Sequence, residues 1–231
     1  DTCAHQAGRP RPASNAVTMP IGGNLDEFLG LAGTLSVTNM NIALTDSFMD
    51  TLQTDEQARR QLDYIAERIH ATGQPGIVFQ DRIKRISCKA DAPFAPNVCG
   101  EAPLAVDESA LLASVNLAAF VTNTKNGGRV FDDVGFARCV RHCVRMLDGM
   151  HDLQIHANES LKQNSLATRK VGVGVMGFAH ALMLLNLSYG STASMEFARR
   201  LSAKLYEAAE AESLRLAEKF GVLRVLLELF H

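Results

Sequence analysis

The sequence DEQARRQLDYIAERIHATGQPGIVF, residues 55–79, predicts a helix that leads directly into a strand. Apolar side chains recur at the three- and four-residue spacing of one helix face, at Ala58, Leu62, Ile65, Ala66 and Ile69. Glycine and proline at 73–76 break this helix, and residues 77–79 form the short apolar run of a buried strand. A helix next to a buried strand indicates an α/β fold.

Similar elements are predicted on both sides of this pair. Expected strands cover residues 16–20 and 38–43, and residues 112–121 are expected to begin a strand or a short helix. Further helices are expected at 25–31, at 46–52 behind an N-cap at Thr45 or Asp46, at 132–156 and at 194–220. The two long helices have apolar stripes at Phe136, Val140, Val144, Leu147 and Met150, and at Ala198, Leu201, Leu205, Ala209 and Leu216. Helices dominate, so we expect an α/β fold with long helices.

Residues 80–107 interrupt this pattern with charged, proline and cysteine residues, and they are expected to form a long loop of the kind often found at functional sites. The loop contains NVCGE, residues 97–101. Alternate side chains of an extended chain point the same way, so Asn97, Cys99 and Glu101 are expected to share one surface. An amide, a thiol and a carboxylate suit chemistry at sulfur assisted by proton transfer. A surface loop with an incidental cysteine is the open alternative.

The glycine run GVGVMG, residues 172–177, matches the G-x-G-x-x-G pattern of dinucleotide sites. Glu196 lies at the distance of the acidic residue that such sites use. The preceding residues SLATRK carry no strand signal, whereas dinucleotide sites need a strand there. Close packing of a helix therefore explains the glycines better than a cofactor site does.

A group of cysteines and histidines lies on the predicted helix 132–156. Cys139 and Cys143 are i,i+4 neighbours on one face, His142 lies beside them, and His151 and His156 follow. The two closely spaced cysteine or histidine pairs of a structural zinc site are missing from this arrangement. Cysteine is among the most buried residue types, so we expect core packing and no metal site.

Composition narrows the class of protein. The chain has 231 residues, 23 Lys plus Arg and 25 Asp plus Glu, giving a formal charge of −2. Nucleic-acid binding is not expected, because it usually needs a basic excess. The five cysteines are an odd number without dense spacing, which favours a reducing compartment, and no secretory or membrane segment is predicted. We therefore expect a cytoplasmic protein.

Several motifs together resemble the catalytic subunit of ribonucleotide reductase, most closely the adenosylcobalamin-dependent class, of which this chain would be a partial member. TNMNIALTDSFMDTL and GQPGIVFQDRI resemble two strand motifs of the family, and APNVCGEAPL resembles its "NPCGE" loop with the radical cysteine. LLASVNLAAFV, VRMLDGMHD and TRKVGVGVMGFAHALMLLNLSYGS resemble the following strand, the long helix and a glycine-containing helix entry. The family uses that glycine run for packing.

The resemblance implies part of a ten-stranded α/β barrel with long helices and a central finger loop that bears the cysteine. On this basis the chain is expected to divide into an unpacked lead-in at 1–15, a partial barrel domain at 16–221 and an atypical tail at 222–231. The family pattern is broken at Val98, which replaces a proline, and at Ala110, which replaces one of two reducing cysteines.

The resemblance also implies a reaction, the conversion of ribonucleotides to deoxyribonucleotides for DNA synthesis. Cys99 would become a thiyl radical, with adenosylcobalamin, which contains cobalt, as cofactor. Glu101 would act as base toward the 3′-hydroxyl, and Asn97 would hydrogen-bond the ribose. Expected partners are the ribonucleotide, a thioredoxin-like or dithiol reductant, and a second chain that completes the barrel. The alternative function is a non-catalytic remnant that acts only as a binding or structural module.

Overall fold

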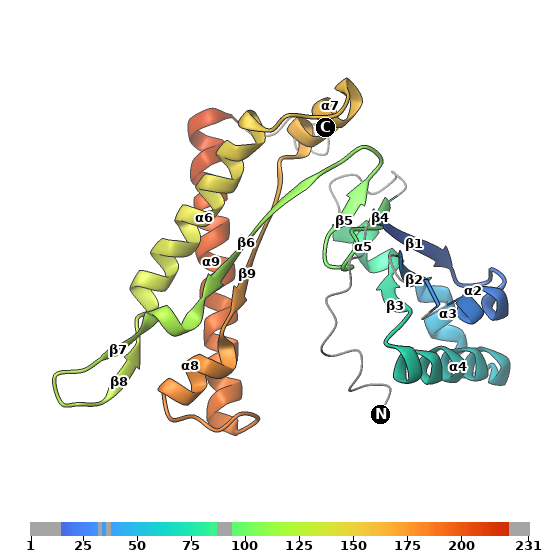
Figure 1. The fold of residues 1–231 in the computed structure, drawn as a ribbon, viewed down its shortest axis with the longest axis horizontal. Coiled ribbons are helices and arrows are strands. Elements are labelled where there is room, and N and C mark those ends of the chain that lie inside the picture. Colours follow the sequence, from blue (N-terminus) through green and yellow to red (C-terminus); the bar gives the residue numbers. More distant parts are fainter. Residues whose placement is uncertain (1–14, 32–33, 36–37, 87–93, 222–231) are drawn as a thin grey trace. The chain divides into compact units, whose positions relative to one another are not determined.

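The computed structural model describes residues 15–31, 34–35, 38–86 and 94–221, and the chain divides into two compact units between Val106 and Asp107. Nearly all of the expected lead-in and the whole expected tail lie outside the described residues, and Asn15 already begins a strand. The predicted division at 15/16 and 221/222 therefore stays a prediction. Both units mix helices and strands, which confirms the α/β class (Figure 1).

The first unit is built on a parallel sheet with the strand order β1-β2-β3. Its elements in chain order are β1 (Asn15–Pro20), α2 (Leu25–Leu31), β2 (Thr38–Leu44), α3 (Asp46–Thr51), α4 (Glu56–Thr72), β3 (Gly76–Phe79), α5 (Gln80–Ile86), β4 (Phe94–Pro96) and β5 (Pro103–Ala105). The helix–strand pair predicted from residues 55–79 is α4 followed by β3. Asp55 caps α4 by accepting the Gln57 N–H, and Gly73 ends it in the left-handed conformation.

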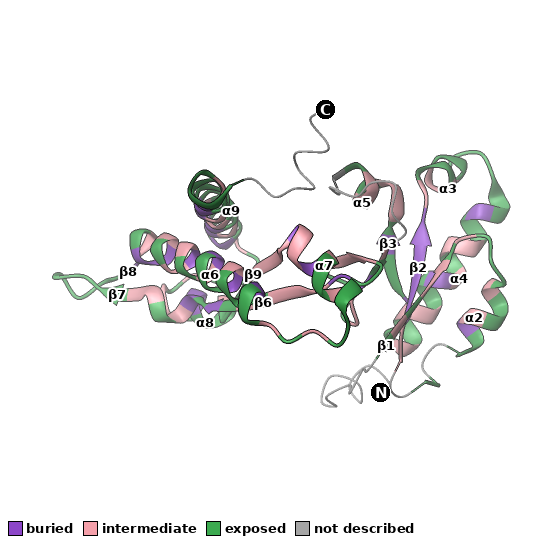
Figure 2. Ribbon diagram, turned by 90° about the horizontal axis from the view of Figure 1, so that it is seen from above, coloured by how far each residue is buried: buried purple, intermediate pink, exposed green. Residues whose placement is uncertain are grey.

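The central strand β2 separates an apolar face from a polar one. Ile42 and Leu44 pack with Leu29 of α2 and Ile65 of α4 into a core cluster. Because side chains alternate along a strand, the asparagines Asn39 and Asn41 lie on the other face. Most of β2 is buried, as its purple colour in Figure 2 shows. This polar face of a buried strand is where the candidate site is found.

The second unit contains a two-stranded parallel sheet of β6 and β9; the long helix α6 packs on this sheet, and the long helix α9 packs against α6 (Figure 1). Its elements are β6 (Ala110–Asn116), the 3-10 helix η1 (Leu117–Phe120), β7 (Val121–Asn123), β8 (Arg129–Phe131), α6 (Asp133–Leu153), α7 (Glu159–Thr168), β9 (Lys170–Met176), α8 (Phe178–Leu184) and α9 (Thr192–Phe220). Asp132 caps α6 and Ser191 caps α9, each through a side-chain oxygen. The core includes the edge-to-face pairs of Phe131 with Phe197 and of Phe120 with Phe136.

Two expectations from the sequence are wrong in detail. Residues 80–107 are not a loop throughout, because α5, β4 and β5 lie there, although residues 87–93 are outside the described part. On α6 the buried stripe continues from Leu147 to His151, one helical turn on, whereas Met150 is 43% exposed. A histidine can take that place because the Lys170 carbonyl provides its Nε2 with a hydrogen-bond partner at 3.0 Å.

Candidate active site

Cys99 lies in the turn of the β4–β5 hairpin, in the first unit. The two strands pair antiparallel, so residues 97–102, called here the Cys99 turn, connect them. Backbone hydrogen bonds from Asn97 N to Ala102 O (2.9 Å) and from Gly100 N to Asn97 O (3.0 Å) close the turn. Gly100 has φ = +91°, a conformation that glycine adopts without steric cost. The predicted cysteine-bearing loop is therefore a tight hairpin turn.

The expected sharing of one face by Asn97, Cys99 and Glu101 rested on an extended backbone, and that premise is wrong because the chain turns here. Asn97 Oδ1 instead accepts the N–H groups of Gly100 and Ala102, both at 3.0 Å. These two bonds use both acceptor positions of the amide oxygen. Any contact of Asn97 with a ligand therefore falls to its Nδ2 group.

The thiol and the carboxylate of the motif are both accessible. Cys99 is a free, exposed cysteine, and Glu101 is exposed two residues later. An accessible thiol can meet a large reactant, and a carboxylate beside it can accept a proton from the same reactant. The chemical roles of Asn97, Cys99 and Glu101 stay predictions.

Three amide side chains lie on the polar face of β2 and beside it, and we call Asn39, Asn41 and Gln74 the amide platform. Asn41 and Gln74 are buried, and Asn39 is half-buried. Asn39 Nδ2 donates a hydrogen bond to the carbonyl oxygen of Val98, inside the Cys99 turn. Gln74 Nε2 in turn donates to Asn39 Oδ1, at 3.4 Å. The platform thus connects the central strand of the sheet to the residue that precedes the cysteine.

Asn41 is the most closely confined member of the amide platform. It is 5% exposed and lies directly opposite Gly76 in the β2–β3 register. A Cβ atom on Gly76 would lie only 2.4 Å from Asn41 Oδ1, and one on Gly100 would lie 3.9 Å from it. Sequence analysis did not select the platform, although polar residues at alternate positions of an apolar strand were a usable signal.

The glycine run 172–177 is not a dinucleotide site, because its first five residues belong to β9 itself rather than to a loop after a strand. A Cβ atom on Gly172 would lie 2.6 Å from Leu112 Cδ2 of the neighbouring strand. Gly177 starts α8 with φ = +73°, close to Asn116 Oδ1. The glycines therefore allow close packing, as expected.

The two cysteines of α6, Cys139 and Cys143, pack against the aromatic core of the second unit. This confirms the prediction that they are packing residues. Burial raises the pKa of the Cys143 thiol, and the neighbouring Cys139 raises it further. His151 is almost completely buried on the same helix, and burial lowers the pKa of its imidazole. These groups stabilise the helix packing and lie in a different unit from the Cys99 turn.

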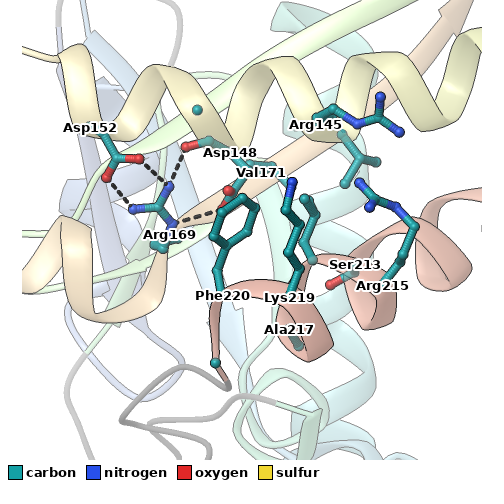
Figure 3. Close-up of a pocket in the computed structure, with 14 residues that line it drawn as sticks. Arg145, Asp148, Asp152, Arg169, Val171, Ser213, Arg215, Ala217, Lys219 and Phe220 are labelled. Atoms are coloured by element: carbon teal, nitrogen blue, oxygen red, sulfur yellow. Dashed lines mark hydrogen bonds and ion pairs between the residues drawn. The ribbon is translucent and has the colours of Figure 1, made fainter.

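A pocket of about 730 Å³ lies between the C-terminal parts of α6 and α9 (Figure 3). At one side Arg169 bonds to Asp148 (2.7 Å) and Asp152 (2.6 Å), which raises the pKa of the arginine and lowers that of Asp152. Arg145 and Arg215, on the other side, both bond to the carboxylate of Glu212. This pocket could not be predicted from the sequence, because three of its ion pairs, Arg145–Glu212, Arg169–Asp148 and Arg169–Asp152, join residues of different helices or of a helix and a later loop.

The fold and the turn define an α/β protein that presents a free thiol at the end of a short hairpin. A family model described as the ribonucleotide reductase barrel domain matches residues 45–226. The chain belongs to this family. This membership confirms the resemblance found in the sequence.

Named relatives and a solved structure agree with that assignment. The vitamin B12-dependent ribonucleoside-diphosphate reductase of Mycobacterium tuberculosis is 32% identical over 202 residues, which are 79% of this chain and 28% of that protein. Its namesake from Thermoplasma acidophilum is 31% identical over 207 residues, 81% of this chain and 26% of that protein. The Actinobacillus ureae class Id ribonucleotide reductase alpha subunit shares the fold, with a TM-score of 0.72 and 20% identity over 92% of this chain and 43% of its own. The chain spans about a quarter of the length of these two curated relatives.

Within the described part of the chain, no helix is both long enough and apolar enough to cross a membrane.

Proposed function

We propose that this chain carries the radical cysteine of a ribonucleotide reductase and takes part in converting ribonucleotides to deoxyribonucleotides. The observation that carries the proposal is the free, exposed Cys99 thiol in a closed hairpin turn that also contains the exposed Glu101. Relatives named as ribonucleoside-diphosphate reductases support it. A cytoplasmic setting suits the proposal, because thiols stay reduced there.

The proposed reaction assigns one role to each residue of the motif. Cys99, as a thiyl radical, takes the hydrogen atom from C3′ of the ribose. Glu101 accepts the proton of the 3′-hydroxyl, the 2′-hydroxyl leaves as water with a proton from the dithiol, and Asn97 donates from Nδ2 to a ribose oxygen. At the end of the reaction Cys99 returns the hydrogen atom to C3′, and Glu101 returns the proton to the 3′ oxygen. The two electrons come from a dithiol, so ribonucleotide and dithiol become deoxyribonucleotide, disulfide and water.

Adenosylcobalamin is the cofactor that we propose, since two of the relatives are named vitamin B12-dependent. When bound, it supplies the carbon radical that takes the hydrogen atom from a thiol. The exposure of Cys99 fits this group, because a large cofactor needs a thiol that it can reach. Cys99 is the residue that would face it.

The reductant and a second chain complete the proposal. Ala110, the first residue of β6, occupies the place of one reducing cysteine of the family pattern. We therefore propose that electrons come from an external dithiol or a thioredoxin-like protein. We also propose a second polypeptide as a partner that contributes to the barrel.

Replacement of one segment in a vitamin B12-dependent relative tests this function. Residues 45–221 of this chain replace the matching segment, and deoxynucleotide formation is measured with adenosylcobalamin, dithiothreitol and each nucleoside diphosphate and triphosphate. Cys99→Ser should abolish product, because a serine O–H bond is too strong for the hydrogen-atom exchange. Cys139→Ser, which changes a thiol of the other unit, should retain it. Ala110→Cys should raise the rate.

Two results would count against the proposal. Equal product from the wild-type segment and from Cys99→Ser would exclude the radical role. A folded hybrid that binds nucleotide and forms no product, even with Ala110→Cys, would favour the non-catalytic module. The observation that favours a non-catalytic module is that alanine, at position 110, replaces one of the two reducing cysteines of the family pattern.

A further inference from the structure

The amide platform is unusual because it buries polar atoms without satisfying all of them. Asn41 Nδ2 and Gln74 Oε1 have no hydrogen-bond partner among the described residues, although both side chains are at least nine-tenths buried. An unsatisfied buried amide group weakens a fold, whereas an apolar side chain of the same shape does not. The stability of the first unit therefore gives no reason for an asparagine at position 41.

The position of Asn41 suggests a different reason. Its amide fills the space that a side chain on Gly76 would take, and its Oδ1 would lie 3.9 Å from a Cβ atom on Gly100 in the Cys99 turn. Asn39, two residues earlier on the same strand and the same face, donates to the Val98 carbonyl. Of two asparagines on one central strand, Asn39 thus bonds to the residue before Cys99, and Asn41 lies near the residue after it.

The alternation of apolar and polar side chains along β2 fixes the register of this strand in the sheet. Its apolar side chains, such as Ile42 and Leu44, anchor the strand in the helix-covered core, so the strand cannot slide by one residue without exposing them. The asparagines on the opposite face are therefore fixed relative to the sheet. Groups that are fixed in this way can hold a catalytic loop in one place.

We propose that Asn39 and Asn41 are positioning residues for Cys99. Asn39 fixes the Val98 carbonyl by a hydrogen bond, and Asn41 supports the backbone at Gly100 with its buried amide. This inference rests on the proposed function for its purpose, but the holding of the turn is a property of the chain alone. It is therefore measurable without nucleotide, cofactor or reductant.

Hydrogen exchange of the full chain, read by mass spectrometry over residues 94–105, tests the holding of the turn. Asn39→Asp keeps the size of the side chain and the acceptor for Gln74, but it replaces the donor to Val98 with an oxygen. Exchange at Gly100 and Ala102 should become about tenfold faster, the size expected for loss of one hydrogen bond. Gln57→Glu, the same chemical change at an exposed position of α4, should leave it unchanged.

Asn41→Ala separates positioning from stability. The midpoint of thermal unfolding should stay within error of the wild type or rise, because an unsatisfied donor is removed, while the turn exchanges several-fold faster. Alkylation of Cys99 by iodoacetamide should change in rate in both variants. If Asn41 had only a structural role, its replacement would lower the midpoint of thermal unfolding and leave the exchange rate of the turn unchanged. That result would overturn the proposal.

The wild-type chain provides a measurement that needs no substitution. The side-chain NH₂ protons of Asn39 should exchange slowly in NMR spectra, and rapid exchange with water would overturn its assigned bond. Unchanged turn exchange in Asn39→Asp would do the same. Neither result depends on deoxynucleotide formation, so failure of the reductase assay and failure of this proposal are separate outcomes.

Discussion

The amide platform beneath the Cys99 turn and the ion-pair cluster between α6 and α9 both bury polar side chains, but they do so in opposite ways. Glu212 is 2% exposed, and its carboxylate bonds to Arg145 at 2.9 Å and to Arg215 at 2.6 Å. The platform has no charged member, and Asn41 Nδ2 lacks a partner among the described residues.

This difference separates two purposes of buried polarity. The Glu212 cluster joins two helices, and its charge is fully compensated, so it acts on the stability of the second unit. The platform leaves a donor unsatisfied and bonds to a turn that bears an exposed thiol. Incomplete satisfaction of buried polar groups is more often found where a structure serves chemistry than where it serves stability.

The largest effect is expected from Glu212→Ala. The change leaves Arg145 and Arg215 facing each other without the carboxylate that joins them, so the free energy of unfolding should fall by about 3 kcal/mol. The loss in the free energy of unfolding can be measured by urea unfolding, with hydrogen exchange of α6 and α9 as the probe. Glu207→Ala removes an exposed carboxylate of the same helix and should cost little. Equal effects of the two changes would show that the buried Glu212 cluster contributes no more to stability than an exposed carboxylate does.

Acid should weaken the same cluster. The two arginines lower the pKa of Glu212 to about 2. Because the folded value lies below the unfolded one, the carboxylate stabilises the fold above the unfolded pKa and loses this contribution as the pH falls toward 2. Between pH 5 and pH 3 the stability advantage of wild type over Glu212→Gln should shrink by about 2 kcal/mol. A constant difference over that range would show that the pKa is not lowered.

A smaller loss is expected from Cys143→Ala, which removes a thiol that packs against the aromatic core. The free energy of unfolding should fall by roughly 1 kcal/mol, as is common for small core truncations. This loss shows how much one apolar contact contributes to the stability of the second unit, for comparison with the Glu212 cluster in the same unit. Stoichiometric zinc bound through this thiol, found by elemental analysis, would contradict the packing role.

The smallest effect on stability is expected from Asn41→Ala, with a change in the free energy of unfolding below about 0.5 kcal/mol. The lost contacts with Gly76 and the removed unsatisfied donor act in opposite directions. Denaturant unfolding followed in β2 and α4 measures it. A loss as large as that of Glu212→Ala would place the amide platform in the same class as the ion-pair cluster.

Much of the fold could be predicted from local sequence. The stripe from Ala58 to Ile69 predicted α4, and the capping aspartate at 55 together with Gly73 sets its ends. The candidate thiol could be predicted as well, since the residues around Cys99 match a family motif. The geometry of the turn could not be predicted. The hairpin depends on the pairing of β4 with β5 and on the hydrogen bonds that the Asn97 side chain accepts from Gly100 and Ala102, and residue spacing alone predicts neither.

The sequence by itself determined the long helices α4, α6 and α9, the alternation of β2 and the place of the candidate cysteine, because these features follow from residues that are close together in the chain. Only the tertiary structure decided that Glu212 and His151 are buried, since their partners Arg145 and Lys170 are distant in sequence. The same holds for Asn41. Its meeting with Gly76 depends on the parallel register of β2 and β3, which arises when the whole sheet forms.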